Sequence, residues 1–174
     1  MKQKELTAEL TTAHNSFIEY INSLSTDEFL FSRNEKWTAG QQLEHIYLSV
    51  KPVTKVTSMP KAEIIKMFGE SNRQSETFES LVKKYSEELQ KGGKAPERFV
   101  PKAVPFDQKE KLIADISETL NELNTAIHNF TEDELDRFLI PHPLLGKLTL
   151  REMLYFTIHH VGHHKEITKR NLNR

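Results

Sequence analysis

Residues 149–170 read TLREMLYFTIHHVGHHKEITKR, and this stretch contains four of the chain's eight histidines. Thr149 is a favourable N-cap, and Glu152, three residues later, completes a capping box. Apolar residues then recur at steps of three and four, the period of an amphipathic helix. The stretch therefore predicts a long final helix that begins at this cap and ends near Arg170.

The histidines of this helix form two pairs at i,i+4 spacing, His160/His164 and His159/His163. Residues four apart lie one above the other on a helix. At about 100° per residue, the first pair falls along the apolar stripe with Phe156, whereas the second pair is rotated towards the charged side. We expect His160 and His164 to face the interior. A divalent cation stabilises such a buried pair because it accepts both neutral nitrogen lone pairs.

Two histidines at helical spacing make only half of a metal site. A zinc-like ion with one open position usually has three protein ligands, so the third must come from another helix. His45 is the expected third ligand because it lies mid-helix beside Leu43 and Ile46, and Gln42 and Ser49 share its face. The side chains expected around these three ligands are Gln42, Glu44, His142 and Thr157.

The H-x-x-x-H spacing alone also suits histidines that cap helices, pair with carboxylates or line surfaces. We expect such structural or surface roles for His14 and His128, which we place near helix edges. A structural or surface role is expected for His142 as well, which lies in a loop, but of these three histidines it is the best placed to reach the mouth of a cleft.

Periodicity elsewhere predicts an all-α fold with a four-helix bundle core, extra short helices and one long crossover. No strand pattern competes, and residues 1–174 are expected to form one domain. Pro52 should kink or shorten the second long helix. The expected helices cover residues 2–24, a segment from Ala39 capped by Thr38, residues 75–90, residues 107–129 and a short turn from Thr131 to near Leu139; the expected irregular segments are 28–36, 58–73 with one helical turn, 94–106 and the rigid loop at 141–146.

Composition excludes several classes of protein. Lys and Arg number 24 and Asp and Glu 25, so the chain lacks the basic field that nucleic-acid binding requires. There is no cysteine, so any metal must be bound by nitrogen and oxygen. The N-terminus has no signal-peptide pattern, and no apolar run is long enough to cross a membrane. We expect a cytoplasmic protein that binds neither nucleic acid nor membranes.

Three motifs in order along the chain resemble the DinB-like superfamily, which includes YfiT-like metal-dependent hydrolases and bacillithiol- and mycothiol-dependent transferases. They are Trp37-Thr38 followed by Glu44-His45-Ile46, the passage from His142 to Glu152, and the final H-x-x-x-H. The resemblance covers about residues 5–170. It implies an up-down-down-up bundle, a homodimer, and a metal site formed by His45, His160 and His164.

Two enzymatic uses of such a site follow. In the first, a divalent ion, with zinc or nickel expected, deprotonates a low-molecular-weight thiol, and the thiolate attacks an electrophile. In the second, the ion activates water for hydrolysis. The family resemblance and the lack of an obvious general base favour the thiol S-transferase. A non-enzymatic, metal-stabilised, stress-related binding protein is the third alternative.

Overall fold

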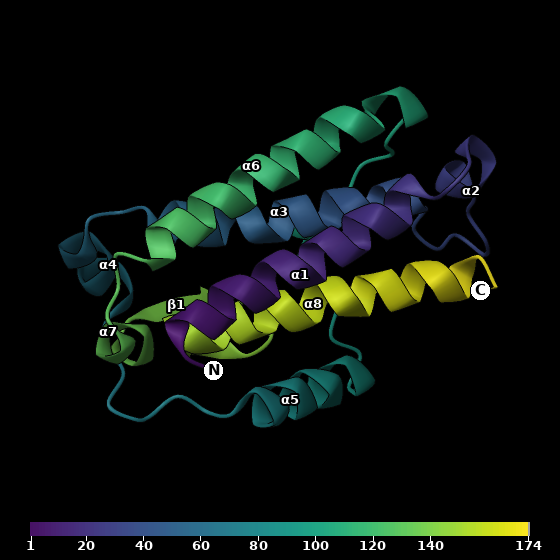
Figure 1. The fold of residues 1–174 in the computed structure, drawn as a ribbon. Coiled ribbons are helices and arrows are strands. Elements are labelled where there is room, and N and C mark those ends of the chain that lie inside the picture. The colour runs from purple at the N-terminus through teal and green to yellow at the C-terminus, as the bar shows by residue number, and fades with distance from the viewer. Residues whose placement is uncertain (174) are drawn as a thin grey trace.

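The computed structural model describes residues 1–173, and its core is a bundle of four long helices (Figure 1). These helices are α1 (Gln3–Asn22), α3 (Ala39–Thr57), α6 (Lys109–Ile127) and α8 (Leu150–Asn171). Helices α1 and α8 run in one direction along the bundle, and α3 and α6 run in the opposite direction (Figure 1). The predicted all-α, up-down-down-up architecture is therefore confirmed.

Two of the long helices, α3 and α8, begin where a threonine side chain caps the first free backbone N–H groups. Thr38 and Thr149 each accept from the backbone N–H three residues on, and Gln41 and Glu152 return the bond, which completes two capping boxes. The apolar stripes of the four helices then meet in one core. Its largest fully buried side chains include Leu6, Leu10, Phe17, Ile21, Leu43, Ile46, Ile116, Leu123 and Ile127.

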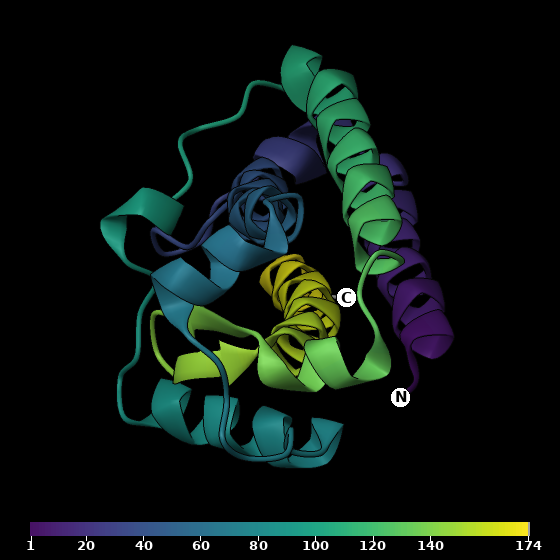
Figure 2. The ribbon, with the colours of Figure 1, turned by 90° about the vertical axis from the view of Figure 1, so that its left-hand side faces the viewer.

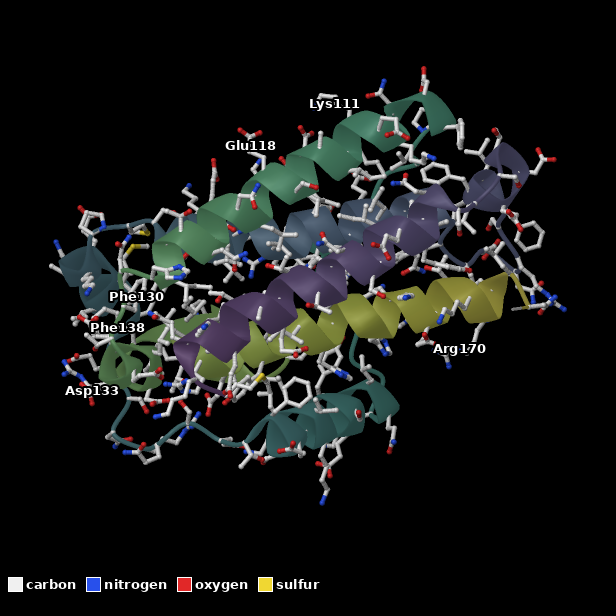
Figure 3. All side chains as sticks on the ribbon, viewed as in Figure 1. Lys111, Glu118, Phe130, Asp133, Phe138 and Arg170 are labelled. Carbon is white, nitrogen blue, oxygen red and sulfur yellow. The ribbon has the colours of Figure 1, made fainter. Side chains whose placement is uncertain are left out.

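Helix α8 has neighbours on more sides than the other long helices of the bundle. It contacts α1, α3, α5 (Phe78–Gln90) and α7 (Glu132–Arg137), and the end-on view places it in the middle of the molecule (Figure 2). By contrast, Lys111 and Glu118 project outwards from α6 (Figure 3). At the end where α6 leads into α7, Phe130 and Phe138 pack edge to face with centroids 5.8 Å apart. None of the described helices is both long and apolar enough to cross a membrane.

The prediction of no strands is wrong, because residues 139–149 form an antiparallel hairpin. Strand β1 (Leu139–His142) pairs with β2 (Gly146–Thr149), and His142 lies opposite Gly146. Each strand has only four residues, too few for alternation to stand out in the sequence. Ile140 and His142 occupy the buried face of β1, and Gly146 adopts a positive φ of 73° that glycine accommodates without strain.

Three further segments differ from the prediction. The expected connector at 28–36 begins inside a helix, α2 (Thr26–Leu30), because Ser25 and Glu28 form a capping box. Its Phe29 packs so closely on α3 that a Cβ at Gly40 would lie 2.7 Å from the phenyl ring. Pro52 does not shorten α3, which continues to Thr57 with the proline on its exposed side. Residues 61–68 form a full helix, α4 (Lys61–Phe68), rather than a single turn.

The crossover between α3 and α6 agrees with the prediction of little regular structure at residues 94–106. After α5 it contains only short 3-10 turns at Glu97–Phe99 and Phe106–Gln108. The first of these turns contacts α3.

Candidate metal centre

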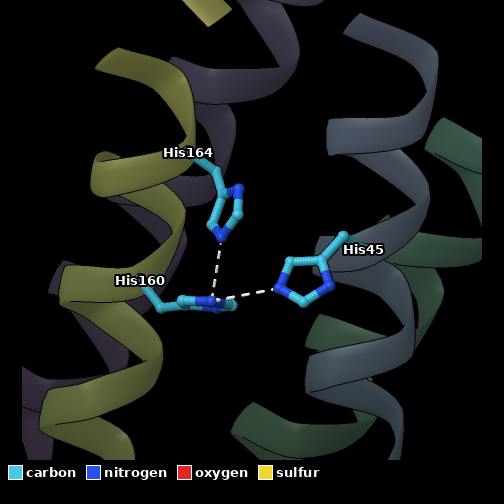
Figure 4. Close-up of side chains that lie close together, drawn as sticks. All are labelled: His45, His160 and His164. Carbon is cyan, nitrogen blue, oxygen red and sulfur yellow. Dashed lines mark hydrogen bonds between the residues drawn. The ribbon is translucent and has the colours of Figure 1, made fainter. Parts of the chain in front are cut away.

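His45, His160 and His164 lie together between α3 and α8 with their rings turned towards one another (Figure 4). The Nε2 atom of His160 is 3.2 Å from that of His45 and 3.0 Å from that of His164. All three side chains are buried. The structure thus brings together the three residues that helix periodicity and the family resemblance had indicated as ligands.

The outer ring nitrogens of two of these histidines fix which inner nitrogen carries a lone pair. His45 Nδ1 lies 2.7 Å from the backbone carbonyl oxygen of Phe99, and His164 Nδ1 lies 2.5 Å from Gln42 Oε1. Because a carbonyl oxygen of the backbone or of a glutamine side chain can only accept a hydrogen bond, each Nδ1 must carry a proton and donate it. In a neutral imidazole the Nε2 is then an acceptor, so His45 and His164 both direct lone pairs at His160.

Hydrogen bonding alone cannot satisfy this arrangement well. His160 Nε2 has at most one proton, whereas two Nε2 lone pairs face it at about equal distance. A divalent cation satisfies all three nitrogens at once. With zinc–nitrogen bonds of about 2.05 Å at tetrahedral angles, ligand nitrogens lie about 3.3 Å apart. The two observed separations, 3.2 and 3.0 Å, are close to that value, so the donor set fits one such ion.

The environment of the three histidines keeps them neutral, which metal binding requires. Burial lowers the pKa of His160 and His164 well below the ordinary value of 6.5, and burial also lowers the pKa of His45. Aromatic rings enclose the cluster: Phe156 stacks on His160 with centroids 4.7 Å apart, and Trp37 stacks on His164 at 6.3 Å.

One side of the cluster opens into a cavity of about 450 Å³, within the range of ligand pockets. His45 and His160 form part of its wall, and the crossover at residues 94–99 and the hairpin at 140–144 line it as well. Within residues 1–173, no aspartate or glutamate lines this cavity. A small molecule in this cavity would therefore reach a bound ion without passing a carboxylate.

His142 also lines the cavity, as expected for a histidine near a cleft. Its Nδ1 accepts the backbone N–H groups of Leu144 and Leu145 at 3.2 and 3.1 Å. These bonds fix the proton on Nε2. Burial lowers the pKa of His142 to about 4, so the ring is a neutral hydrogen-bond donor rather than a base. It packs on Phe156 with centroids 4.2 Å apart and is not one of the clustered ligands.

The other side chains expected around the metal site behave differently from one another. Gln42 contacts His164 directly. Thr157 is buried, but its hydroxyl donates to the carbonyl of Met153 within its own helix. Glu44 is only half-buried, and its Oε2 makes no hydrogen bond to any described residue. The carbonyl of Phe99 is a contact that the sequence analysis missed, since a backbone oxygen leaves no trace in residue type.

The remaining histidines are separate from this cluster. His159 and His163 are half-buried against α5, where each ring lies 6.0–6.1 Å from the ring of Tyr85, rather than on the charged side that periodicity favoured. His14 is buried in the middle of α1, not at a helix edge, and its Nδ1 bonds to Leu10. His128 is exposed just after α6.

Comparison with known families agrees with this geometry. No curated protein matches the chain. The family model of the DinB superfamily matches residues 9–167, a range that contains α3, α6, most of α1 and α8, and each of the three clustered histidines. The chain therefore belongs to the DinB superfamily.

Proposed function

We propose that this protein is a divalent-metal-dependent S-transferase that joins a low-molecular-weight thiol to an electrophilic small molecule. The observation that carries the proposal is the convergence of three buried Nε2 atoms, with His45 and His160 in the wall of a cavity that no aspartate or glutamate of residues 1–173 lines. A structural zinc site normally has four protein ligands and no open position. Three ligands beside a cavity of about 450 Å³ fit a site that receives a substrate.

The absence of a general base favours thiol transfer over hydrolysis. Metal-dependent hydrolysis commonly uses a carboxylate to accept a proton from water. Among the described residues no carboxylate side chain lines this cavity, and the Nδ1 of His142 is already occupied by two backbone N–H groups. A thiol needs less help, because its ordinary pKa of about 8.5 lies near neutrality and a bound cation lowers that pKa further.

The protein's own residues have distinct parts in this proposal. His45, His160 and His164 hold the ion, which would supply positive charge to stabilise a thiolate. Gln42 and the Phe99 carbonyl orient two of the three rings through their Nδ1 protons. The apolar wall, which includes Phe156, excludes bulk water. The neutral Nε2–H of His142 is available to donate to an electronegative atom of the electrophile.

The reaction can be tested with protein loaded with zinc or nickel, a panel of cellular thiols, and the neutral electrophile monochlorobimane. In this reaction the thiol sulfur bonds to the chloromethyl carbon, chloride leaves, and the thiol proton passes to water. We expect adduct fluorescence that a chelator abolishes. His164→Ala should remove the activity, whereas His163→Ala, one position away on the same helix, should retain it.

Other outcomes of the same experiment would overturn the proposal. If no thiol is consumed, while ester or amide substrates are cleaved in a chelator-sensitive reaction, the protein is a hydrolase. If both assays are silent and the metal remains tightly bound, the protein is a non-enzymatic metal-binding bundle.

A further inference from the structure

The rim of the cavity beside the histidine cluster is positively charged. Lys51 extends from α3, and Lys94 and Arg98 belong to the crossover; all three are exposed and line the cavity. The inner end, at His45 and His160, is buried. The cationic groups therefore lie towards solvent and the candidate metal ligands lie at depth.

These three cations have no acidic partners within residues 1–173. Basic groups elsewhere in the protein do form ion pairs with carboxylates, for example Lys111 with Asp115. In contrast, Lys51 Nζ bonds to the phenol oxygen of Tyr47 at 3.1 Å, and the Arg98 guanidinium lies 4.9 Å from the ring centroid of Phe99. Neither the lining residues nor the ion pairs supply a negative charge to this rim. A ligand anion could therefore bind these three groups without breaking an existing ion pair.

Between the rim and the histidines, the cavity wall is apolar. It includes Val53, Val56, Leu89, Ile140, Met153 and Phe156. Burial of an apolar molecule against such a wall is favourable, by about 25 cal/mol per Å². A molecule that fits both parts has an apolar body and a negatively charged group at one end.

The charged rim is also connected to the candidate metal centre. Arg98 immediately precedes Phe99, whose carbonyl accepts the Nδ1 proton of His45. The two residues lie in the same 3-10 turn, Glu97–Phe99. A ligand anion on Arg98 therefore contacts the segment that orients one of the three imidazoles.

We propose that the cavity binds a small organic anion with an apolar body, whose body contacts the apolar wall and whose negative group is bound by Lys51, Lys94 and Arg98. This inference rests on the proposed function, because it assigns that anion as the electrophilic substrate. Its apolar end would carry the electrophilic atom towards His45 and His160, and its charged end would remain at the rim.

Calorimetric titration of the metal-loaded protein with three matched probes tests the inference. The probes are 4-phenylbutyrate, 4-phenylbutan-1-ol and 4-phenylbutylamine, which share an apolar body and differ in charge. Exposed ion contacts each change affinity by a factor of about two to five, so three together predict roughly 10- to 100-fold tighter binding of the carboxylate than of the alcohol. The amine should bind most weakly, and added salt should reduce the preference.

A bound metal ion could itself attract a carboxylate, so charge variants are needed to distinguish the contribution of the rim from that of the metal. In the triple variant Lys51→Gln, Lys94→Gln, Arg98→Gln, we expect the preference for the carboxylate to fall to about twofold or less. The control variant Lys4→Gln, Lys55→Gln, Lys83→Gln removes three exposed lysines that do not line the cavity, and should leave the preference unchanged.

Two results would overturn the inference. One is equal affinity for the carboxylate and the alcohol in the wild-type protein. The other is a preference that survives in the rim variant, because the metal would then be responsible. Monochlorobimane has no charge, so the transferase assay can succeed while this inference fails.

Discussion

The first turn of α8 and the middle of the same helix both bury polar side chains, but they satisfy them differently. At the first turn, Glu152 is fully buried and accepts from both Nη atoms of Arg73 and from the backbone N–H groups of Thr149 and Glu76. In the middle, two lone pairs face His160 and no described side chain supplies enough protons for them.

Arg151 extends the same contrast. It is buried and bonds to Asp136, Glu132 and the carbonyl of Met1, which fixes α7 and the N-terminus against α8. Buried polar groups with complete partners within the chain stabilise a fold, whereas buried polar groups with an incomplete set call for an external ligand. The first cluster should therefore govern stability and the second should govern metal binding.

The largest effect on folding is expected for Glu152→Ala. This change removes the partner of Arg73, the N-cap bond to Thr149 and the bond to Glu76, so the free energy of unfolding should fall by about 3 kcal/mol. Urea unfolding of the metal-free protein measures it. Glu166→Ala is the matched control on the same helix, because Glu166 is exposed, and it should cause no measurable change. Equal costs for the two variants would show that the polar cluster around Glu152 does not govern stability.

An effect on metal binding without a comparable effect on folding is expected for Gln42→Ala. Loss of an outer partner of a metal-binding histidine typically weakens metal affinity by about 10- to 100-fold. Competition with a chromophoric chelator measures this affinity. Gln42→Glu retains an acceptor for His164 Nδ1 and should restore tight binding. If the alanine variant binds metal as tightly as the wild type, Gln42 has no role in orienting His164.

The pH dependence of stability should also separate buried histidines from buried carboxylates. Burial lowers the pKa of His14 and His142 from 6.5 to about 4. As the pH falls, these histidines therefore bind protons in the unfolded chain before they do so in the folded protein. The free energy of unfolding should decrease as the pH falls from 6.5 to about 4, by up to about 1.4 kcal/mol per pH unit for each histidine. Above pH 6.5 both states are neutral at these positions, so no dependence arises there.

The carboxylates respond in a lower range. The pKa of Glu152 is lowered from its ordinary value of 4.5, despite the opposing effect of burial, because Arg73 and two backbone N–H groups stabilise the charged form. The stability from this group is present above about pH 4.5 and is lost only as the pH falls through the lowered pKa. Urea unfolding with chelator at pH 7.5, 5.5 and 4.5 tests the difference. His14→Gln should flatten the slope above pH 4.5, and an unchanged slope would exclude His14 as its source.

The features of the fold and of the histidine cluster that could be predicted from the sequence are those that depend on residues close together in the chain. The N-cap at Thr38 and the capping box at Thr149 gave the starts of α3 and α8, and i,i+4 spacing gave the inward pair on α8. The four-residue strands of the hairpin were missed because so short a segment has no clear alternation. The ion pair of Arg73 with Glu152 joins residues 79 apart, and nothing local indicates such a partner.

The most direct test of the central claim is the metal content of His160→Ala compared with that of His159→Ala. Both variants remove one imidazole from α8, but only the first removes one of the three clustered Nε2 atoms. Mass spectrometric metal analysis after dialysis should find about one divalent ion per chain in the wild type and in His159→Ala. It should find almost none in His160→Ala. Equal metal content in the two variants, or none in the wild type, would contradict a metal centre formed by His45, His160 and His164.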